Sequence, residues 1–207
     1  PRTLQNAGYE TLLIGGQHVT GGDDNTIRRL GFDYVHTLRD ARQIAAAAVE
    51  FLSRPHDKPF YLNLGFFEPH RDETGGFKST PPDSGFGVEV PAYLPDSPEA
   101  RGEFIELQGA VSWLDSAVGV VLNALRSQDL LKDTWVIFTT DHGIAMPRAK
   151  CTLYDPGIET ALLMYAEPFG LTGGRVIRNM VSHVDFVPTV LDALGIRAET
   201  AFQGRSY

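Results

Sequence analysis

Short runs of apolar and β-prone residues alternate with longer stretches of helical periodicity along this 207-residue chain. The short runs predict buried strands, because such runs between turn signals are typical of strands covered on both faces. They occupy 11–14, 135–140 and 160–165. The run at 60–64 predicts a further short strand, and a mixed alternation predicts a more exposed strand over 175–181.

Apolar residues recur at helical spacing in three stretches. The first helix is expected to begin at Thr37, where Thr-x-x-Asp resembles a capping box, and to end before Pro55. The second covers about 98–126. A shorter third helix is expected to take Asp185 as its N-cap and to close at Gly195.

Strands that alternate with helices predict an α/β fold, with a mostly parallel sheet and helices on both faces. We expect residues 1–207 to form a single domain of this kind. The stretch 72–98 holds much of the proline and glycine with little periodicity. It predicts a long ordered loop or flap, of the kind that shapes substrate choice on a fixed scaffold.

Composition excludes several classes of protein. Hydrophobic residues make up 43% and charged residues 21%, as in an ordinary soluble domain. The formal charge of -8 argues against a nucleic-acid partner, although a local basic cluster can still bind an anion. No apolar run suggests a membrane span, and the first residues do not resemble a signal peptide. Compartment and oligomeric state stay open.

Polar residues that could bind a metal ion or an anion follow the predicted strand at 135–140. Asp141 and His142 can together hold a cation, and Gly143 lets the backbone turn away. Arg148 and Lys150 come next and can bind anions. The alternative is a structural turn in which Asp141 caps backbone donors.

Two further strand ends carry similar residues. Gln17 and His18 follow the run at 11–14, where a surface-loop histidine is the alternative. His70 and Arg71 follow the run at 60–64, and Pro69 stiffens the backbone that presents His70. His70 can protonate a leaving group and Arg71 can grip an anion bidentately, unless both belong to a solvated turn.

Four motifs, in this order, resemble those of the sulfatase family and span most of the chain. They are Ala7-Gly-Tyr-Glu-Thr-Leu-Leu-Ile-Gly with His18, Phe66-Phe-Glu-Pro-His-Arg71, Phe138-Thr-Thr-Asp-His-Gly with Lys150-x-Thr-Leu-Tyr-Asp-x-Gly157, and Val181-Ser-His-Val-Asp-Phe-Val-Pro-Thr189. The Pro-His-Arg form is most similar to the sulfamidase (heparan N-sulfatase) branch.

The resemblance implies an alkaline phosphatase-like fold and the metal-assisted hydrolysis of a sulfuric ester or N-sulfate, with a small sulfated compound such as a sugar as substrate. Asp141 and His142 would bind a divalent metal, with calcium the expected ion. An imidazole is a softer ligand than the asparagine often found there, so metal identity is less fixed than metal presence. His18, His70 and Lys150 would be catalytic. The expected substrate-binding residues are Gln17, Arg71 and Arg148.

The chain departs from the family pattern in several places. Gly16 stands where the family has a lysine. The Cys/Ser-x-Pro-x-Arg segment that yields the formylglycine nucleophile is absent, and Cys151 lacks its proline and arginine, so we reject Cys151 as nucleophile. The family's N-terminal acidic pair has no counterpart. These departures predict a partial sulfatase-like domain that is inactive by itself.

Two other functions stay open at this point. One is a phosphoryl or phosphonate hydrolase of the alkaline phosphatase superfamily, with the same Asp-His ligands and a Thr or Ser nucleophile. The other is a catalytically silent binding protein, which Gly16 and the missing nucleophile would favour.

Overall fold

The computed structural model describes residues 1–21, 23–77, 80–198 and 200–207. These residues form two compact units. The first unit contains residues 1–37, 55–65 and 174–207, and the second contains residues 38–54 and 66–173.

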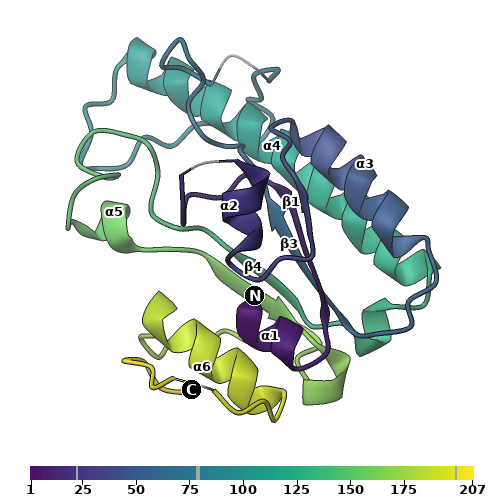
Figure 1. Ribbon diagram of the computed structural model, residues 1–207. Helices are drawn as coiled ribbons and strands as arrows, with labels where there is room; N and C mark the ends of the chain where they lie inside the picture. The colour runs from purple at the N-terminus through teal and green to yellow at the C-terminus, as the bar shows by residue number, and fades with distance from the viewer. Residues whose placement is uncertain (22, 78–79, 199) are drawn as a thin grey trace. The chain divides into compact units, whose positions relative to one another are not determined.

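The first unit contains a parallel three-stranded sheet, in which β1 (Glu10–Gly15) and β3 (Phe60–Gly65) lie side by side (Figure 1). Its order is β2-β1-β3, with β2 over Tyr34–His36. The pairing of β1 with β3 runs from Glu10 opposite Phe60 to Gly15 opposite Gly65. The two predicted strands therefore end side by side, as the carboxyl ends of parallel strands do.

A buried hydrogen-bond network fastens β1 to the turn that precedes β2. The hydroxyl of Thr11 donates to the carbonyl oxygen of Gly31 at 2.8 Å, and its backbone N–H donates to Asp33 Oδ2 at 2.9 Å. Burial by itself would raise the pKa of Asp33, but hydrogen bonds from Thr11 and Gln5 outweigh burial and lower that pKa. This network holds β1 in its register within the unit.

Three helices accompany this sheet in the first unit: α1 (Arg2–Asn6), α2 (Asp24–Arg28) and α6 (His183–Ala193). The prediction of Asp185 as the N-cap of α6 is wrong, because Ser182 occupies that position. Asp185 is instead the third residue of a capping box with Ser182. Each side chain there accepts a hydrogen bond from the other residue's backbone, which satisfies two N–H groups at once.

Residues 175–181 form no strand, contrary to the prediction. A strand needs a neighbour for its backbone N–H and C=O groups. No described strand of the chain pairs with this segment, and its apolar side chains are exposed, with Val176 at 80% and Met180 at 99%.

Two long helices pack against each other in the second unit (Figure 1). They are α3 (Ala41–Leu52) and α4 (Pro98–Ser127). Helix α3 begins at Ala41 rather than at Thr37, because Asp40 is its N-cap and accepts hydrogen bonds from the N–H groups of Arg42 and Gln43, each at 3.0 Å. The guanidinium of Arg42 lies 3.5 Å from the ring centroid of Trp113 and so joins α3 to α4.

By length and composition alone, α4 could cross a membrane: it has 30 residues and a window of mean hydropathy 1.2. The long core helix of a soluble protein meets the same criterion. The apolar window of α4 is 33% buried, and apolar residues on one face of the helix account for most of this burial. Its buried side chains include Phe104, Leu107, Leu114, Val121 and Leu125.

Strands β4 (Val136–Thr139) and β5 (Leu162–Tyr165) form an antiparallel pair. A parallel pair normally needs a crossover connection through a full helix. The segment between β4 and β5 contains only the short α5 (Asp155–Ile158), which fits an antiparallel pair. The expectation that both strands are buried is also wrong, since both are half-buried and Leu163 is 62% exposed. Short 3-10 helices cover Leu131–Asp133 and Glu167–Phe169.

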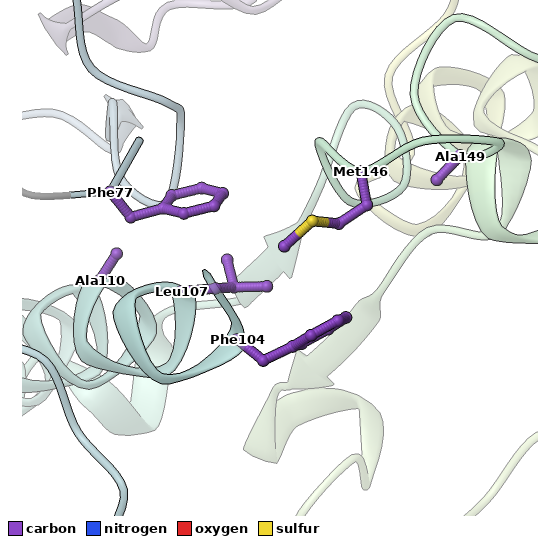
Figure 2. Packing of buried hydrophobic residues seen from close by; sticks show 6 residues of the cluster. All are labelled: Phe77, Phe104, Leu107, Ala110, Met146 and Ala149. Carbon is purple, nitrogen blue, oxygen red and sulfur yellow. The ribbon is translucent and has the colours of Figure 1, made fainter. Parts of the chain in front are cut away.

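A hydrophobic cluster supports the loop that follows β4 (Figure 2). It joins three segments of the second unit: the stretch before α4, α4 itself, and the loop over 144–150. Its buried members are Phe77, Phe104, Leu107, Ala110, Met146 and Ala149. The described parts of the predicted flap, 72–77 and 80–97, contain no helix or strand, but Phe77 is only 1% exposed. The flap is therefore anchored at this point.

Candidate active site

The Pro-His-Arg segment forms a constrained turn in the second unit. The backbone N–H of His70 donates to the carbonyl oxygen of Phe67 at 2.9 Å, and the two rings lie 4.7 Å apart between centroids. This hydrogen bond and ring contact hold the imidazole of His70 against its own turn.

The Glu68–Pro69 peptide bond of the same turn is cis. Burial raises the pKa of the Glu68 carboxyl above its ordinary value.

His70 meets Lys150 across a long separation in sequence. The distance from Lys150 Nζ to His70 Nε2 is 3.3 Å, and His70 Nδ1 lies 2.7 Å from the carbonyl oxygen of Arg71. A carbonyl oxygen can only accept, so Nδ1 carries the ring hydrogen and the lone pair of Nε2 faces the ammonium of Lys150. The structure thus brings together two of the predicted catalytic residues.

The loop that carries Lys150 is closed on itself. The backbone N–H of Lys150 donates to the carbonyl oxygen of Ile144 at 3.0 Å, and the N–H of Gly143 donates to that of Gly157 at 3.0 Å. Lys150 therefore lies in the same compact loop as the Asp-His-Gly turn.

Asp141 and His142 have a geometry that suits a cation. Asp141 Oδ1 lies 3.5 Å from His142 Nε2. His142 Nδ1 lies 2.7 Å from the carbonyl oxygen of Gly143 and must donate to it, which leaves a lone pair on Nε2. Histidines that bind metals usually donate their other N–H in this way. These two side chains fit a divalent cation as ligands.

Asp141 and His142 have no third His, Cys, Asp or Glu side chain beside them in the described residues. No group of three or more His, Cys, Asp or Glu side chains within 1–21, 23–77, 80–198 and 200–207 is close enough to hold a metal. Asp141 and His142 can therefore supply two ligands to a cation.

Gly143 is required at this turn for a different reason from the one expected. Its φ is not in the left-handed region. Instead, a Cβ at Gly143 would lie 1.8 Å from the carbonyl oxygen of Pro156. The absence of a side chain therefore lets two backbone segments of the loop approach each other.

The three predicted substrate-binding residues differ in exposure and in whether their side chains are already hydrogen-bonded to protein groups. Arg148 is exposed, with its guanidinium 5.7 Å from the ring centroid of Tyr154. Gln17 uses its amide within its own turn, because Oε1 accepts from the N–H groups of Val19 and Thr20 and Nε2 donates to the carbonyl oxygen of Thr20. Arg71 is 23% exposed and its guanidinium donates to protein groups. Only Arg148 presents its side chain to solvent without such bonds in the described structure.

His18 belongs to the first unit, where it is exposed after β1. Gly16 lies between β1 and His18 and donates its N–H to the carbonyl oxygen of Gly65 at 2.7 Å. A Cβ at Gly16 would lie 3.7 Å from that oxygen, an ordinary contact distance. The departure from the family's lysine is therefore not forced by the backbone.

We expect Gly16→Lys to fold normally. Its side chain would project from an exposed position without a clash, so its free energy of unfolding should stay within about 0.5 kcal/mol of the parent. Denaturant unfolding of the parent, Gly16→Lys and the uncharged control Gly16→Met would test this. A loss well beyond that range in both variants would show that the position requires glycine.

The sequence assigned the flap only a general role and assigned none to Tyr93, which lies beside the Asp-His-Gly turn. A hollow of about 310 Å³ beside the Asp-His-Gly turn is lined by Tyr93, Gly143, Ile144, Pro156, Glu159, Thr160 and Ala161. Burial raises the pKa of the Tyr93 hydroxyl. The available signal was an aromatic residue in a stretch rich in proline and glycine.

The chain belongs to the sulfatase family, because the Sulfatase family model matches residues 1–196. It is 32% identical over 224 residues to N-sulphoglucosamine sulphohydrolase of Homo sapiens, with 95% of this chain and 44% of that protein covered. The chain thus spans less than half the length of that relative.

Solved structures share the fold. A sulfatase-family protein from Bacteroides fragilis superposes with a TM-score of 0.74 at 19% identity, over 100% of this chain and 57% of the other. A protein solved in complex with its substrate, D-glucosamine-2-N,6-O-disulfate, gives a TM-score of 0.66 at 16% identity, over 99% of this chain and 62% of the other. The predicted alkaline phosphatase-like α/β class is confirmed.

Proposed function

We propose that the protein to which this chain belongs hydrolyses sulfuric esters or N-sulfates with the assistance of a divalent metal. The contact of 3.3 Å between Lys150 and His70 carries the proposal. An ammonium and a protonated imidazole that lie this close together can donate to different oxygens of one bound anion. The Asp-His-Gly turn lies in the same closed loop as Lys150, so cation and anion binding would be neighbours.

Lys150, His70 and Arg148 have roles that their surroundings support. Lys150 would bind a sulfuryl oxygen and stabilise the charge that develops on it. The lone pair of His70 Nε2 faces the ammonium of Lys150. When an anion draws Lys150 away, Nε2 can take up a proton from solvent and deliver it to the leaving oxygen or nitrogen. Arg148, whose side chain is exposed, would bind the rest of the substrate. His18 and Gln17 belong to the first unit, and their roles stay predictions from the resemblance.

The metal would be held by Asp141 and His142. Calcium is the proposed ion, as the family implies. The imidazole of His142 is a softer ligand than calcium prefers, so the comparison of metals in the assay below decides the ion. When bound, a divalent cation polarises sulfuryl oxygens and orients the nucleophile. The nucleophile, a formylglycine in this family, would come from outside residues 1–207, because no Cys/Ser-x-Pro-x-Arg segment lies within them.

A sulfated sugar is the proposed class of substrate. The Homo sapiens relative is named for N-sulphoglucosamine, and the structural relative is bound to a disulfated glucosamine. A guanidinium such as that of Arg148 can bind the acidic groups of such sugars.

The direct experiment is an assay of the full-length protein on para-nitrophenyl sulfate and para-nitrophenyl phosphate. We expect the sulfate to be the better substrate. Removal of metal with a chelator should lower its hydrolysis at least about tenfold, because the cation is asked to stabilise the developing charge. Addition of Ca²⁺ should restore it, and Mg²⁺ serves as the comparison ion.

Two results would contradict the proposal. Faster hydrolysis of the phosphate would favour a phosphoryl or phosphonate hydrolase. A full-length protein that turns over neither ester and whose melting temperature does not respond to the chelator would indicate a silent binding protein.

A further inference from the structure

The side chain of Arg71 links three segments of the second unit. Nε donates to the carbonyl oxygen of Ala145 at 2.7 Å, and Nη1 donates to that of Gly75 at 2.6 Å. Nη2 donates to Glu103 Oε2 at 2.7 Å and contacts Met146 Sδ at 3.2 Å. The flap, α4 and the loop over 144–150 therefore all bond to one guanidinium.

The same guanidinium is also held from its face. Its central carbon lies 4.6 Å from the ring centroid of Phe77, which is 1% exposed. Phe77 and Met146 belong to the hydrophobic cluster in Figure 2. A planar group packed on a ring and bonded along its edge has little freedom to turn toward a substrate.

Arg71 is connected to both members of the His70–Lys150 pair. Its carbonyl oxygen accepts the hydrogen bond from His70 Nδ1 at 2.7 Å and so fixes the tautomer of that ring. Its side chain holds Ala145, inside the loop that the hydrogen bond from Lys150 to Ile144 closes. One residue therefore orients the imidazole with its backbone and anchors the loop that carries the lysine with its side chain.

We propose that Arg71 is a positioning residue that keeps Lys150 within reach of His70, rather than a residue that grips the sugar. This inference rests on the proposed sulfatase activity for its kinetic consequences. Glu103 is its partner on α4, and their ion pair has side-chain exposures of 23% and 48%. Lysine cannot replace Arg71, because a single ammonium cannot bond to the three segments in these directions.

The kinetic test compares a substrate without a sugar with one that has it. In the full-length protein, Arg71→Met should lower kcat by roughly 10–100-fold for both para-nitrophenyl sulfate and a sulfated glucosamine, with little change in KM. Arg71→Lys should not rescue the loss. A sugar-gripping arginine would instead raise KM for the glucosamine and leave the aryl ester unaffected, which would overturn the proposal.

A double-mutant cycle separates positioning from general stability. Because Arg71 is proposed to act through Lys150, Arg71→Met should cost no more than about twofold in a Lys150→Ala background. An undiminished loss in that background would mean that Arg71 acts elsewhere. Arg101→Met is the matched control, since Arg101 pairs with Asp96 on the exposed surface near the start of α4 and should leave kcat unchanged.

A measurement without catalysis keeps the two proposals apart. The rate at which an amine-reactive reagent labels Lys150, read by mass spectrometry, should rise severalfold in Arg71→Met, whereas labelling of Lys132 should not change. Equal labelling of Lys150 in parent and variant would overturn the positioning role, whatever ester the protein hydrolyses. An inactive parent with increased labelling would leave Arg71 as a positioning residue and refute only the proposed activity.

Discussion

Replacing His70 with alanine in the full-length protein is expected to lower kcat for an aryl sulfate by about 10²–10⁴-fold, the range for loss of a general acid or base. Its Nε2 faces Lys150 Nζ at 3.3 Å, so the ring lies where an anion held by the lysine would bind. The effect should be smaller for esters with better leaving groups, because these need less protonation. A series of substituted phenyl sulfates measures this dependence.

Lys150→Ala should cost about 10²–10³-fold, as does loss of one donor to a developing oxyanion. Since the two side chains are in contact, the double variant should lose much less than the product of the single losses. Lys132→Ala is the control, because Lys132 pairs with Asp129 on the exposed surface. Losses that multiply would show that the pair does not act on one group.

The positions of polar residues after strand ends predicted this pair in part, although β3 and β4 lie in different sheets. Polar residues after 60–64 and 135–140 were singled out because ligands bind beyond the carboxyl ends of strands. His70 and Lys150 do meet, although 80 positions separate them in the chain. Their catalytic roles rest on the resemblance and on chemistry, and the assays above decide them.

The partners of Arg71 could not be predicted from the sequence. Its bonds to Ala145 and Glu103 join residues 74 and 32 positions away. Every residue has a backbone carbonyl oxygen, so the sequence does not show which carbonyl an arginine will bond to. It therefore cannot distinguish an arginine that bonds to the backbone from one that binds an anion. The position of Arg71 after a strand and next to His70 favoured the interpretation that its guanidinium binds an anion.

Two of the errors in the fold share a cause. The strand expected at 175–181 and the burial expected for β4 and β5 were inferred from apolar composition, which says nothing about whether a neighbour is present. The parallel strands β1 and β3 were correctly anticipated because their runs are bounded by glycine and proline on the chain and are separated by the helix over Ala41–Leu52. The short α5 gave no such separation for β4 and β5.

The same Gly→Ala change should have opposite effects at two positions of the second unit. Gly143→Ala is expected to destabilise the protein by about 3 kcal/mol or more, because its Cβ would meet the carbonyl oxygen of Pro156 at 1.8 Å. That oxygen belongs to the backbone, so relief requires the loop itself to move. Gly119 lies within α4, and a Cβ there would have nothing within 4 Å. Alanine at that position should therefore add about 0.5–1 kcal/mol of stability.

Denaturant unfolding of the two variants measures both free energies in one experiment, and equal signs would contradict the close-approach argument. The change at Gly143 should also affect the proposed metal ligand His142. The carbonyl oxygen of Gly143 accepts the hydrogen bond from His142 Nδ1 and thereby leaves Nε2 free for a cation. Displacement of that oxygen should release the ring, so Gly143→Ala should also lose the chelator-sensitive part of its melting temperature, whereas Gly119→Ala should keep it. A Gly143→Ala protein that is less stable but responds to the chelator as the parent does would mean that the turn is a packing feature and does not orient the metal ligands.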